Sequence, residues 1–179
     1  MIRTPWRPLG RAVAVAASLA VLVLGVAVPA QARPLEEPQN EEHCVVLLGD
    51  AADTVVCAAS IAAAVQEFTA QTGYSVSESD DEVGPLVVYS LARLYVDAGY
   101  GGSSYLFTRS TACNGVTLSG VPDLSVVGIN DAVSSFLTYG TCTVRLYADT
   151  GYGGATYGYT TSQSSLPTFN DVATAARAR

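Results

Sequence analysis

The feature that most restricts how this chain can fold is an internal repeat in its second half. Residues 93–102 read RLYVDAGYGG and residues 145–154 read RLYADTGYGG, so only two of the ten positions differ. Each copy is followed by an Asn-Asp pair, at 130–131 and at 170–171, although the spacing to that pair is shorter in the second copy. Short β-prone runs separated by glycine-bearing turns surround both copies. A duplicated β unit is the simplest interpretation of this pattern.

Both copies also repeat the spacing of two tyrosines and a glycine. A tyrosine ends a β-prone run, a second tyrosine follows five residues later, and a glycine stands two residues after that. A hairpin loop that folds back over its own sheet needs a positive φ, which glycine adopts without a Cβ clash. The two rings can then pack over the folded loop and keep water from its backbone. The residues concerned are Tyr95, Tyr100 and Gly102 in the first copy and Tyr147, Tyr152 and Gly154 in the second.

These units resemble the motif of the βγ-crystallin superfamily, in which an aromatic residue and a folded hairpin are followed by aromatic-x-Gly. The resemblance covers about residues 86–179. It implies an all-β domain, a βγ-crystallin-like double Greek-key β-sandwich of about eight strands between Leu86 and Ala176. The segments 130–135 (NDAVSS) and 170–175 (NDVATA) resemble the calcium-binding signature of the microbial branch: two Asn or Asp, two free positions, Ser or Thr, then Ser.

In that branch, calcium sites form between paired motifs, with the Asn/Asp part and the hydroxyl contributed by different motifs. Calcium prefers oxygen ligands, which these side chains and backbone carbonyls supply. The second arm departs from the signature at Ala175, where a serine is expected. A purely structural alternative stays open, because Asn and Asp favour turns and Ser or Thr can bond nearby backbone. The calcium ligands implied by the resemblance are Asn130, Asp131 and Ser134 of the first arm, and Asn170, Asp171 and Thr174 of the second.

The layout also resembles the exported actinobacterial metalloproteinase-inhibitor family. That family combines a signal segment, a cysteine-paired N-terminal segment, a Leu-Tyr-x-Asp-x-x-(Tyr/Phe)-Gly-Gly unit, an Asn-Asp-x-x-Ser-Ser arm and a cysteine before the second unit, here Cys142. It implies an extracellular metalloproteinase as a partner. The candidate for an inhibitory loop is the segment 113–115, because a disulfide-braced loop binds without a large ordering cost. Bracing is equally what a small secreted fold requires.

The first 32 residues have the composition of a secretory signal peptide. Three arginines precede an apolar run from Ala12 to Val28, and Ala30-Gln31-Ala32 offers small residues for cleavage. A membrane anchor is the alternative, but the run is shorter than the ~20 residues that span a bilayer. Cleavage after residue 32 leaves six arginines against sixteen acidic residues, a net charge of −10. We therefore expect a secreted, extracellular protein that binds neither nucleic acid nor, after cleavage, a membrane.

All four cysteines follow this segment, and an even number in an exported chain predicts disulfides. Zinc is the competing interpretation, but there is no Cys-x-x-Cys and only one histidine. Four cysteines allow three pairings. We favour Cys44–Cys57 and Cys113–Cys142, because each pair then lies within one structural unit.

The region before the repeat divides into three segments. Residues 33–43 are charged and predicted to be disordered. Residues 44–73 are predicted to form a cap, with a hairpin whose outer ends carry cysteines and a helix over 58–71 that ends at Gly73. Residues 74–85 form an acidic linker, for which solvation explains the charges better than cation binding does.

The sequence offers no constellation typical of catalysis. His43 is the only histidine, and we expect it at the surface of the flexible N-terminal segment. The segment 99–102 (GYGG) lacks the further glycine spacing and the lysine of a phosphate loop. Three hypotheses for a non-enzymatic protein remain: a calcium-binding extracellular module, a metalloproteinase inhibitor with or without calcium, and a structural or stress-related scaffold.

Overall fold

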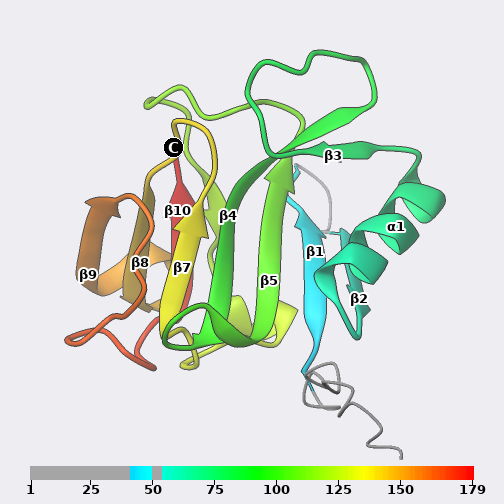
Figure 1. The fold of residues 1–179 in the computed structure, drawn as a ribbon. Coiled ribbons are helices and arrows are strands. Elements are labelled where there is room, and N and C mark those ends of the chain that lie inside the picture. Colours follow the sequence, from blue (N-terminus) through cyan, green and yellow to red (C-terminus); the bar gives the residue numbers. More distant parts are fainter. Residues whose placement is uncertain (1–40, 50–53) are drawn as a thin grey trace, which may run out of the picture. The chain divides into compact units, whose positions relative to one another are not determined.

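The computed structural model describes residues 41–49 and 54–179 (Figure 1). The predicted signal peptide 1–32, most of the predicted disordered segment 33–43 and the hairpin turn 50–53 lie outside the described residues. Among the described residues, no helix is long and apolar enough to cross a membrane.

The two copies of the repeat form the centre of two separate sheets. In each copy, the strand carrying the first tyrosine pairs antiparallel with the strand that follows the folded hairpin. A later strand of the same copy pairs with the free edge of the tyrosine-bearing strand. These strands are β4 (Val87–Asp97), β5 (Gly101–Arg109) and β7 (Ser135–Thr138) in the first copy, and β8 (Val144–Asp149), β9 (Gly153–Thr160) and β10 (Ala175–Ala178) in the second.

Each copy also contributes a segment to the sheet of the other copy. The short strand β6 (Ser119–Val121) belongs to the first copy but pairs with β10. In return, Gln163 of the second copy forms an isolated bridge with Phe136 of β7. This crossed connectivity is the double Greek key expected from the sequence. Residues 86–179 contain seven strands, and the expected eighth is only the Gln163 bridge.

The predicted cap is built into the first sheet. Strand β1 (His43–Leu47) pairs antiparallel with β2 (Thr54–Ala58) and parallel with β5, so the first sheet has the order β2-β1-β5-β4. Strand β3 (Ser75–Ser77), inside the predicted linker, pairs with the start of β4 on the same edge as β7. Figure 1 shows these strands side by side, with α1 (Ile61–Thr72) next to β1 and β2.

The helix starts three residues later than predicted. Ala58 ends β2, and Ser60 is the N-cap, with its side chain accepting a hydrogen bond from the Ala63 N–H. Gly73 ends the helix with φ 75°, as expected for a glycine in the left-handed region. Two buried side chains of α1, Ala64 and Phe68, face the sheet.

Alternation along the strands separates two apolar cores. The main core lies between the sheets and includes Leu91, Leu94, Phe136 and Leu146, all at most 1% exposed. The second core lies under α1 and contains Val45, Val56, Ala64, Phe68, Val88 and Leu106. Cys44 and Val46 point into the main core while Val45 points towards the helix, so β1 contributes to both cores.

Two disulfides close the loops around this framework. Cys44 pairs with Cys57 across the β1–β2 hairpin, where the two residues are directly opposite in the strand register. Cys113 pairs with Cys142, which joins the β5–β6 connection to the turn before β8. These are the pairings that we favoured from the sequence. In the chain-entropy model, each such closure stabilises the fold by roughly 3 kcal/mol.

Candidate functional site

The two folded hairpins have nearly the same backbone geometry. Tyr100 and Tyr152 have φ of 66° and 65°, and Gly102 and Gly154 have φ of 70° and 72°. A Cβ on Gly102 would lie 2.5 Å from the Val96 Cγ2 atom, so a side chain does not fit under the folded loop. Both the positive φ and the close approach therefore require glycine at this position.

Aromatic pairs close each hairpin as expected. The ring centroids of Tyr95 and Tyr100 lie 5.7 Å apart, and those of Tyr147 and Tyr152 lie 5.5 Å apart, both in tilted or edge-on arrangements. Such geometry is favourable for aromatic pairs. The positive φ of the second tyrosine was not foreseen, because the left-handed region is unusual for a bulky residue.

Each Asn-Asp arm is fixed to the tyrosine-bearing strand of its own copy. The Ser134 N–H donates to the Tyr95 carbonyl at 2.9 Å, and the Thr174 N–H donates to the Tyr147 carbonyl at 2.8 Å. These matching bonds place the hydroxyl residue of each arm at the end of the sandwich where the hairpins fold. The local geometry of the hairpin therefore positions the arm.

The two arms cross and bond to each other through their backbones. The Asp131 N–H donates to the Ala173 carbonyl at 3.0 Å, and the Asp171 N–H donates to the Val133 carbonyl at 3.1 Å. Both aspartates have positive φ, 50° and 55°. The crossing brings into contact residues that are about forty positions apart in the sequence, and the two arms are related by a pseudo-twofold.

Side chains repeat the same exchange. The Ser134 hydroxyl donates to Asp171 Oδ1 at 3.1 Å, and the Thr174 hydroxyl donates to Asp131 Oδ1 at 3.2 Å. Each cluster therefore contains the carboxylate of one arm and the hydroxyl of the other. We name them cluster I (Asp131 and Thr174) and cluster II (Asp171 and Ser134).

The asparagines hold the carboxylates in place. The Asn130 amide N–H donates to Asp131 Oδ2 at 2.7 Å, and the Asn170 amide N–H donates to Asp171 Oδ2 at 2.6 Å. The Asn130 Oδ1 atom is buried and has no hydrogen-bond partner among the described residues. An unpaired buried oxygen on a residue that bonds to the cluster I carboxylate is chemically suited to a hard cation.

The arms differ at their last position. Ser135 accepts from the Tyr100 N–H at 3.1 Å and donates to the Asp97 carbonyl at 2.6 Å, which ties the first arm to the first hairpin. Ala175 occupies the corresponding place in the second arm and has no hydroxyl. There, Thr174 Oγ1 lies 2.8 Å from the Ala148 carbonyl oxygen and 3.2 Å from Asp131 Oδ1, so the one hydroxyl proton is shared between two acceptors.

One other group of potential ligands is found among the described residues. The possible ligand atoms, a carboxylate oxygen of Glu42 and the Sγ atoms of Cys44 and Cys57, lie within 4.8 Å of one another. The two sulfur atoms are bonded to each other, so no thiolate is present to bind a metal. This group is therefore a disulfide with a neighbouring carboxylate.

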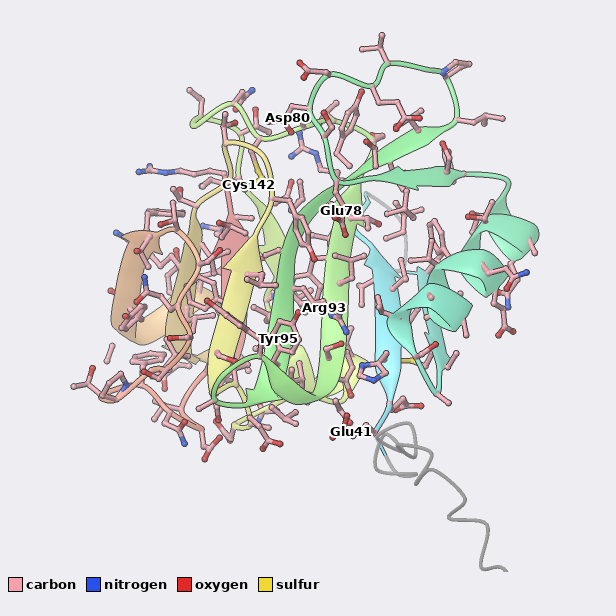
Figure 2. All side chains as sticks on the ribbon, in the orientation of Figure 1. Glu41, Glu78, Asp80, Arg93, Tyr95 and Cys142 are labelled. Carbon is pink, nitrogen blue, oxygen red and sulfur yellow. A yellow bond between two sulfur atoms is a disulfide. The ribbon has the colours of Figure 1, made fainter. Side chains whose placement is uncertain are left out.

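The expectation that His43 lies at the surface is wrong. His43 is only 5% exposed and begins β1, and its Nδ1 atom lies 2.8 Å from the Ser104 hydroxyl oxygen. Arg93, labelled in Figure 2, donates from Nε to the same oxygen at 2.8 Å. Glu41 lies 4.0 Å from His43 Nε2. The pairing of β1 with β5 draws the histidine onto the sheet, which sequence spacing alone does not indicate.

Among known proteins, similarity is found to solved structures of βγ-crystallin domains. No protein-family model matches the chain, and no curated protein matches it. A mutant βγ-crystallin domain from Clostridium beijerinckii is 22% identical with a TM-score of 0.40, and the match covers 49% of this chain and 95% of that one. A βγ-crystallin domain from Flavobacterium johnsoniae is 27% identical with a TM-score of 0.39, covering 50% of this chain and 93% of that one. A βγ-crystallin from an archaeon is 21% identical with a TM-score of 0.37, covering 49% of this chain and 95% of that one.

The chain's own strand exchange defines its fold class. In the described residues it is all-β with one α-helix, a βγ-crystallin-like double Greek-key sandwich preceded by a disulfide-closed hairpin and that helix. Those structures match about half of this chain.

Proposed function

We propose that this protein is a non-catalytic, calcium-binding extracellular module. The observation that supports it most is the reciprocal exchange between the arms, in which the carboxylate of each aspartate meets the hydroxyl of the opposite arm. Calcium takes six to eight oxygen ligands, and side chains of this kind together with backbone carbonyls can supply them. The fold itself brings the residues of both clusters together, which supports the proposal.

Each cluster has a defined pair of side-chain ligands in this proposal. Cluster I uses Asp131 and Thr174, and cluster II uses Asp171 and Ser134. Asn130 and Asn170 orient the carboxylates and complete the ligand set. Binding would replace the hydroxyl-to-carboxylate hydrogen bonds with bonds to the ion. We expect modest affinity, on the order of 10⁻⁵ to 10⁻³ M, as in calcium sensor and extracellular modules.

Calcium titration tests this function directly. A ligand that binds only the native state adds about 2.7 kcal/mol at a hundredfold excess over its Kd. Melting temperatures in millimolar calcium should therefore exceed those in chelator by several degrees, and calorimetry should show heat. Superimposable melts without heat would reject calcium binding.

Paired variants distinguish the two clusters. Asp131→Asn and Thr174→Val should both weaken cluster I, and their combination should cost less than the sum of the two. Asp171→Asn and Ser134→Ala should do the same for cluster II. Glu67→Gln on the exposed face of α1 removes one charge elsewhere and should leave calcium binding unchanged.

Export from the cell is part of this proposal. It is supported by the N-terminal sequence and by the two disulfides, which persist in oxidising compartments. Mass spectrometry of protein collected outside expressing cells should find a chain that begins after Ala32. A chain retained with its first 32 residues would contradict it.

A second candidate function, inhibition of an extracellular metalloproteinase, is favoured by one exposed loop. Val116 is 81% exposed in the β5–β6 connection. Asn114 Oδ1 accepts from the backbone N–H of Val116 at 3.0 Å and of Thr117 at 2.7 Å. The Cys113–Cys142 disulfide anchors the loop, and a pre-ordered loop binds a partner at a lower entropic cost.

The neighbouring turn is fixed as well. Asp80 Oδ2 accepts from the Thr141 N–H at 3.1 Å, and the Thr141 hydroxyl donates to the Cys113 carbonyl at 3.1 Å. Figure 2 shows Asp80 and Cys142 at the same end of the molecule. The start of the loop that carries Val116 is thus held at Cys113 by two contacts from the turn that contains Thr141 and Cys142.

A protease assay decides between these functions. The protein should slow cleavage of a small substrate by a thermolysin-type enzyme, and Val116→Asp should relieve that inhibition. Val83→Asp is the matched control, because Val83 is similarly exposed at 85%. Undiminished cleavage rejects inhibition of this protease class, and failure of both this assay and the calcium titration favours a scaffold protein.

A further inference from the structure

Most of the arginines that the structure describes gather at one sheet. The structure describes five arginines, and four of them lie on or beside the second sheet, β6-β10-β8-β9. Arg145 on β8 and Arg177 on β10 are directly opposite in the strand register. Ala176 and Ala178 face the main core, so Arg177 and Arg179 point to the outer face. Arg109 ends β5 and bonds to Ser119 at the edge of this sheet.

No acidic residue pairs with these arginines among the described residues, where the only ion pair joins His43 and Glu41. Like charges directly opposite each other on neighbouring strands repel. Tyrosine rings hold the guanidinium groups instead: Arg177 lies 3.5 Å from the centroid of the Tyr152 ring, and Arg145 and Arg179 lie 4.4 and 3.8 Å from that of Tyr159. The face therefore keeps a positive charge that the protein itself does not neutralise.

A cleft of about 480 Å³ opens at the edge of this face, where β5 ends next to β6 and β10. Among the described residues its lining includes no acidic side chain. Burial lowers the pKa of Arg109, which indicates that this guanidinium is partly withdrawn from water. The polar and aromatic lining residues that matter here are Arg109, Ser110, Thr111, Ser119, Tyr152 and Arg177.

Hydroxyl oxygens in the cleft accept hydrogen bonds from the Arg109 guanidinium. Arg109 Nε donates to the Thr111 hydroxyl oxygen at 2.6 Å, and its Nη1 donates to the Ser119 hydroxyl oxygen. Since both oxygens accept from the guanidinium, both hydroxyl protons remain available to a ligand. Among the described residues, two arginines and two hydroxyl groups line the cleft without an acidic side chain, an arrangement that suits an oxyanion.

We propose that this cleft binds a phosphate group, held between Arg109 and Arg177 with donation from Thr111 and Ser119. The planar guanidinium matches two phosphate oxygens at once. Arg145 and Arg179 continue the positive face beyond the cleft, so a ligand with two or more phosphates binds more tightly than inorganic phosphate. This site is separate from the Asn-Asp arms and does not depend on calcium.

Calorimetric titration of the purified protein with inorganic phosphate, pyrophosphate and tripolyphosphate tests the proposal. Chelator and low salt are required, because phosphates bind calcium and salt screens the arginines. We expect affinity to rise with the number of phosphates. Arg109→Gln and Arg177→Gln should each weaken pyrophosphate about tenfold, the loss expected for one charge-assisted hydrogen bond.

Matched variants separate a specific site from net charge. Arg93→Gln changes the net charge equally but lies on the first sheet, so its pyrophosphate affinity should stay within about twofold of that of the native protein. Arg177→Lys keeps the charge, loses the planar fork and should also weaken binding. Thermal melts establish that each variant is folded.

Three results would overturn the proposal. The first is that the native protein binds no pyrophosphate. The second is that Arg93→Gln weakens pyrophosphate binding as much as Arg177→Gln does. The third is that sedimentation shows self-association that Arg177→Gln abolishes, while no phosphate binds. In the last case the arginine face contacts an acidic segment of a second copy of this chain.

Discussion

The two copies of the repeat share one backbone frame but have different outer faces. In the strand register, Leu137 of β7 lies opposite Arg93, whereas Arg177 of β10 lies opposite Arg145. Two residues further on, the first copy has Tyr139, which packs with the core under α1, and the second copy has Arg179. The outer face of the first sheet therefore packs against an apolar cap. The outer face of the second sheet carries arginines that form no ion pair among the described residues.

This difference shows which positions the frame fixes. The hairpin tyrosines, the glycines and the arm contacts are nearly superimposable in φ and distance, because they build the inner geometry of the sandwich. Outward positions on β7 and β10 are not constrained by the core, since alternate residues of a strand point to opposite faces. One duplicated frame can therefore carry two different surfaces.

Removing the apolar anchor of the cap should have the largest effect. Phe68 is 0% exposed under α1, so Phe68→Ala should destabilise the protein by about 3–5 kcal/mol. On the other sheet, Arg179→Ala should cost less than about 1 kcal/mol, because no element of the described residues packs over that face. Urea denaturation measures both changes. Equal losses would show that the two outer faces contribute alike.

Exchanging the last arm residue should have a smaller effect. Ser135→Ala leaves the partly buried Tyr100 N–H and Asp97 carbonyl without their shared partner and should cost about 1–2 kcal/mol. Ala175→Ser adds the hydroxyl to the other copy and should stabilise by less than about 1 kcal/mol. If Ala175→Ser instead destabilises by more than that, the hairpins differ at this corner despite their matching φ values.

The smallest effect appears only in alkaline solution. Burial, with a contribution from Glu78, raises the pKa of Tyr139 to about 12 from its ordinary value of 10.0. The folded state then holds the proton more tightly than the unfolded state. The stabilisation that protonated Tyr139 gives the folded state is therefore complete below about pH 10 and is lost as the pH rises towards 12. Tyr139→Phe should flatten this part of the stability curve, and an unchanged slope would assign it to another tyrosine.

Local patterns in the sequence predicted the repeated parts of the fold. Tyrosine–glycine spacing located both hairpins, the cysteines marked the β1–β2 hairpin, and Gly73 marked the helix end. The crossing of the Asn-Asp arms followed from the family resemblance. Each of these depends on residues that are close together in the chain, where spacing and backbone preference act directly.

Such local patterns did not predict the pairing of strands that are far apart in the sequence. Strand β6 is only Ser-Gly-Val, which has no recognisable periodicity, and its partner β10 is far along the chain. The parallel pairing of β1 with β5 and the burial of His43 likewise arise from closure of the whole sheet. The arginine face was missed because its members are scattered in sequence and meet only when β8 and β10 pair.

The exchange of β6 has a consequence for the order in which the protein can be completed. Synthesis delivers the first copy well before residues 175–178, and until they appear β6 has nothing to pair with. An emerging chain therefore holds a half-built sandwich with an open strand edge, the kind of edge that attracts other chains. Each half of the duplicated domain therefore needs the other half to complete the pairing of its strands.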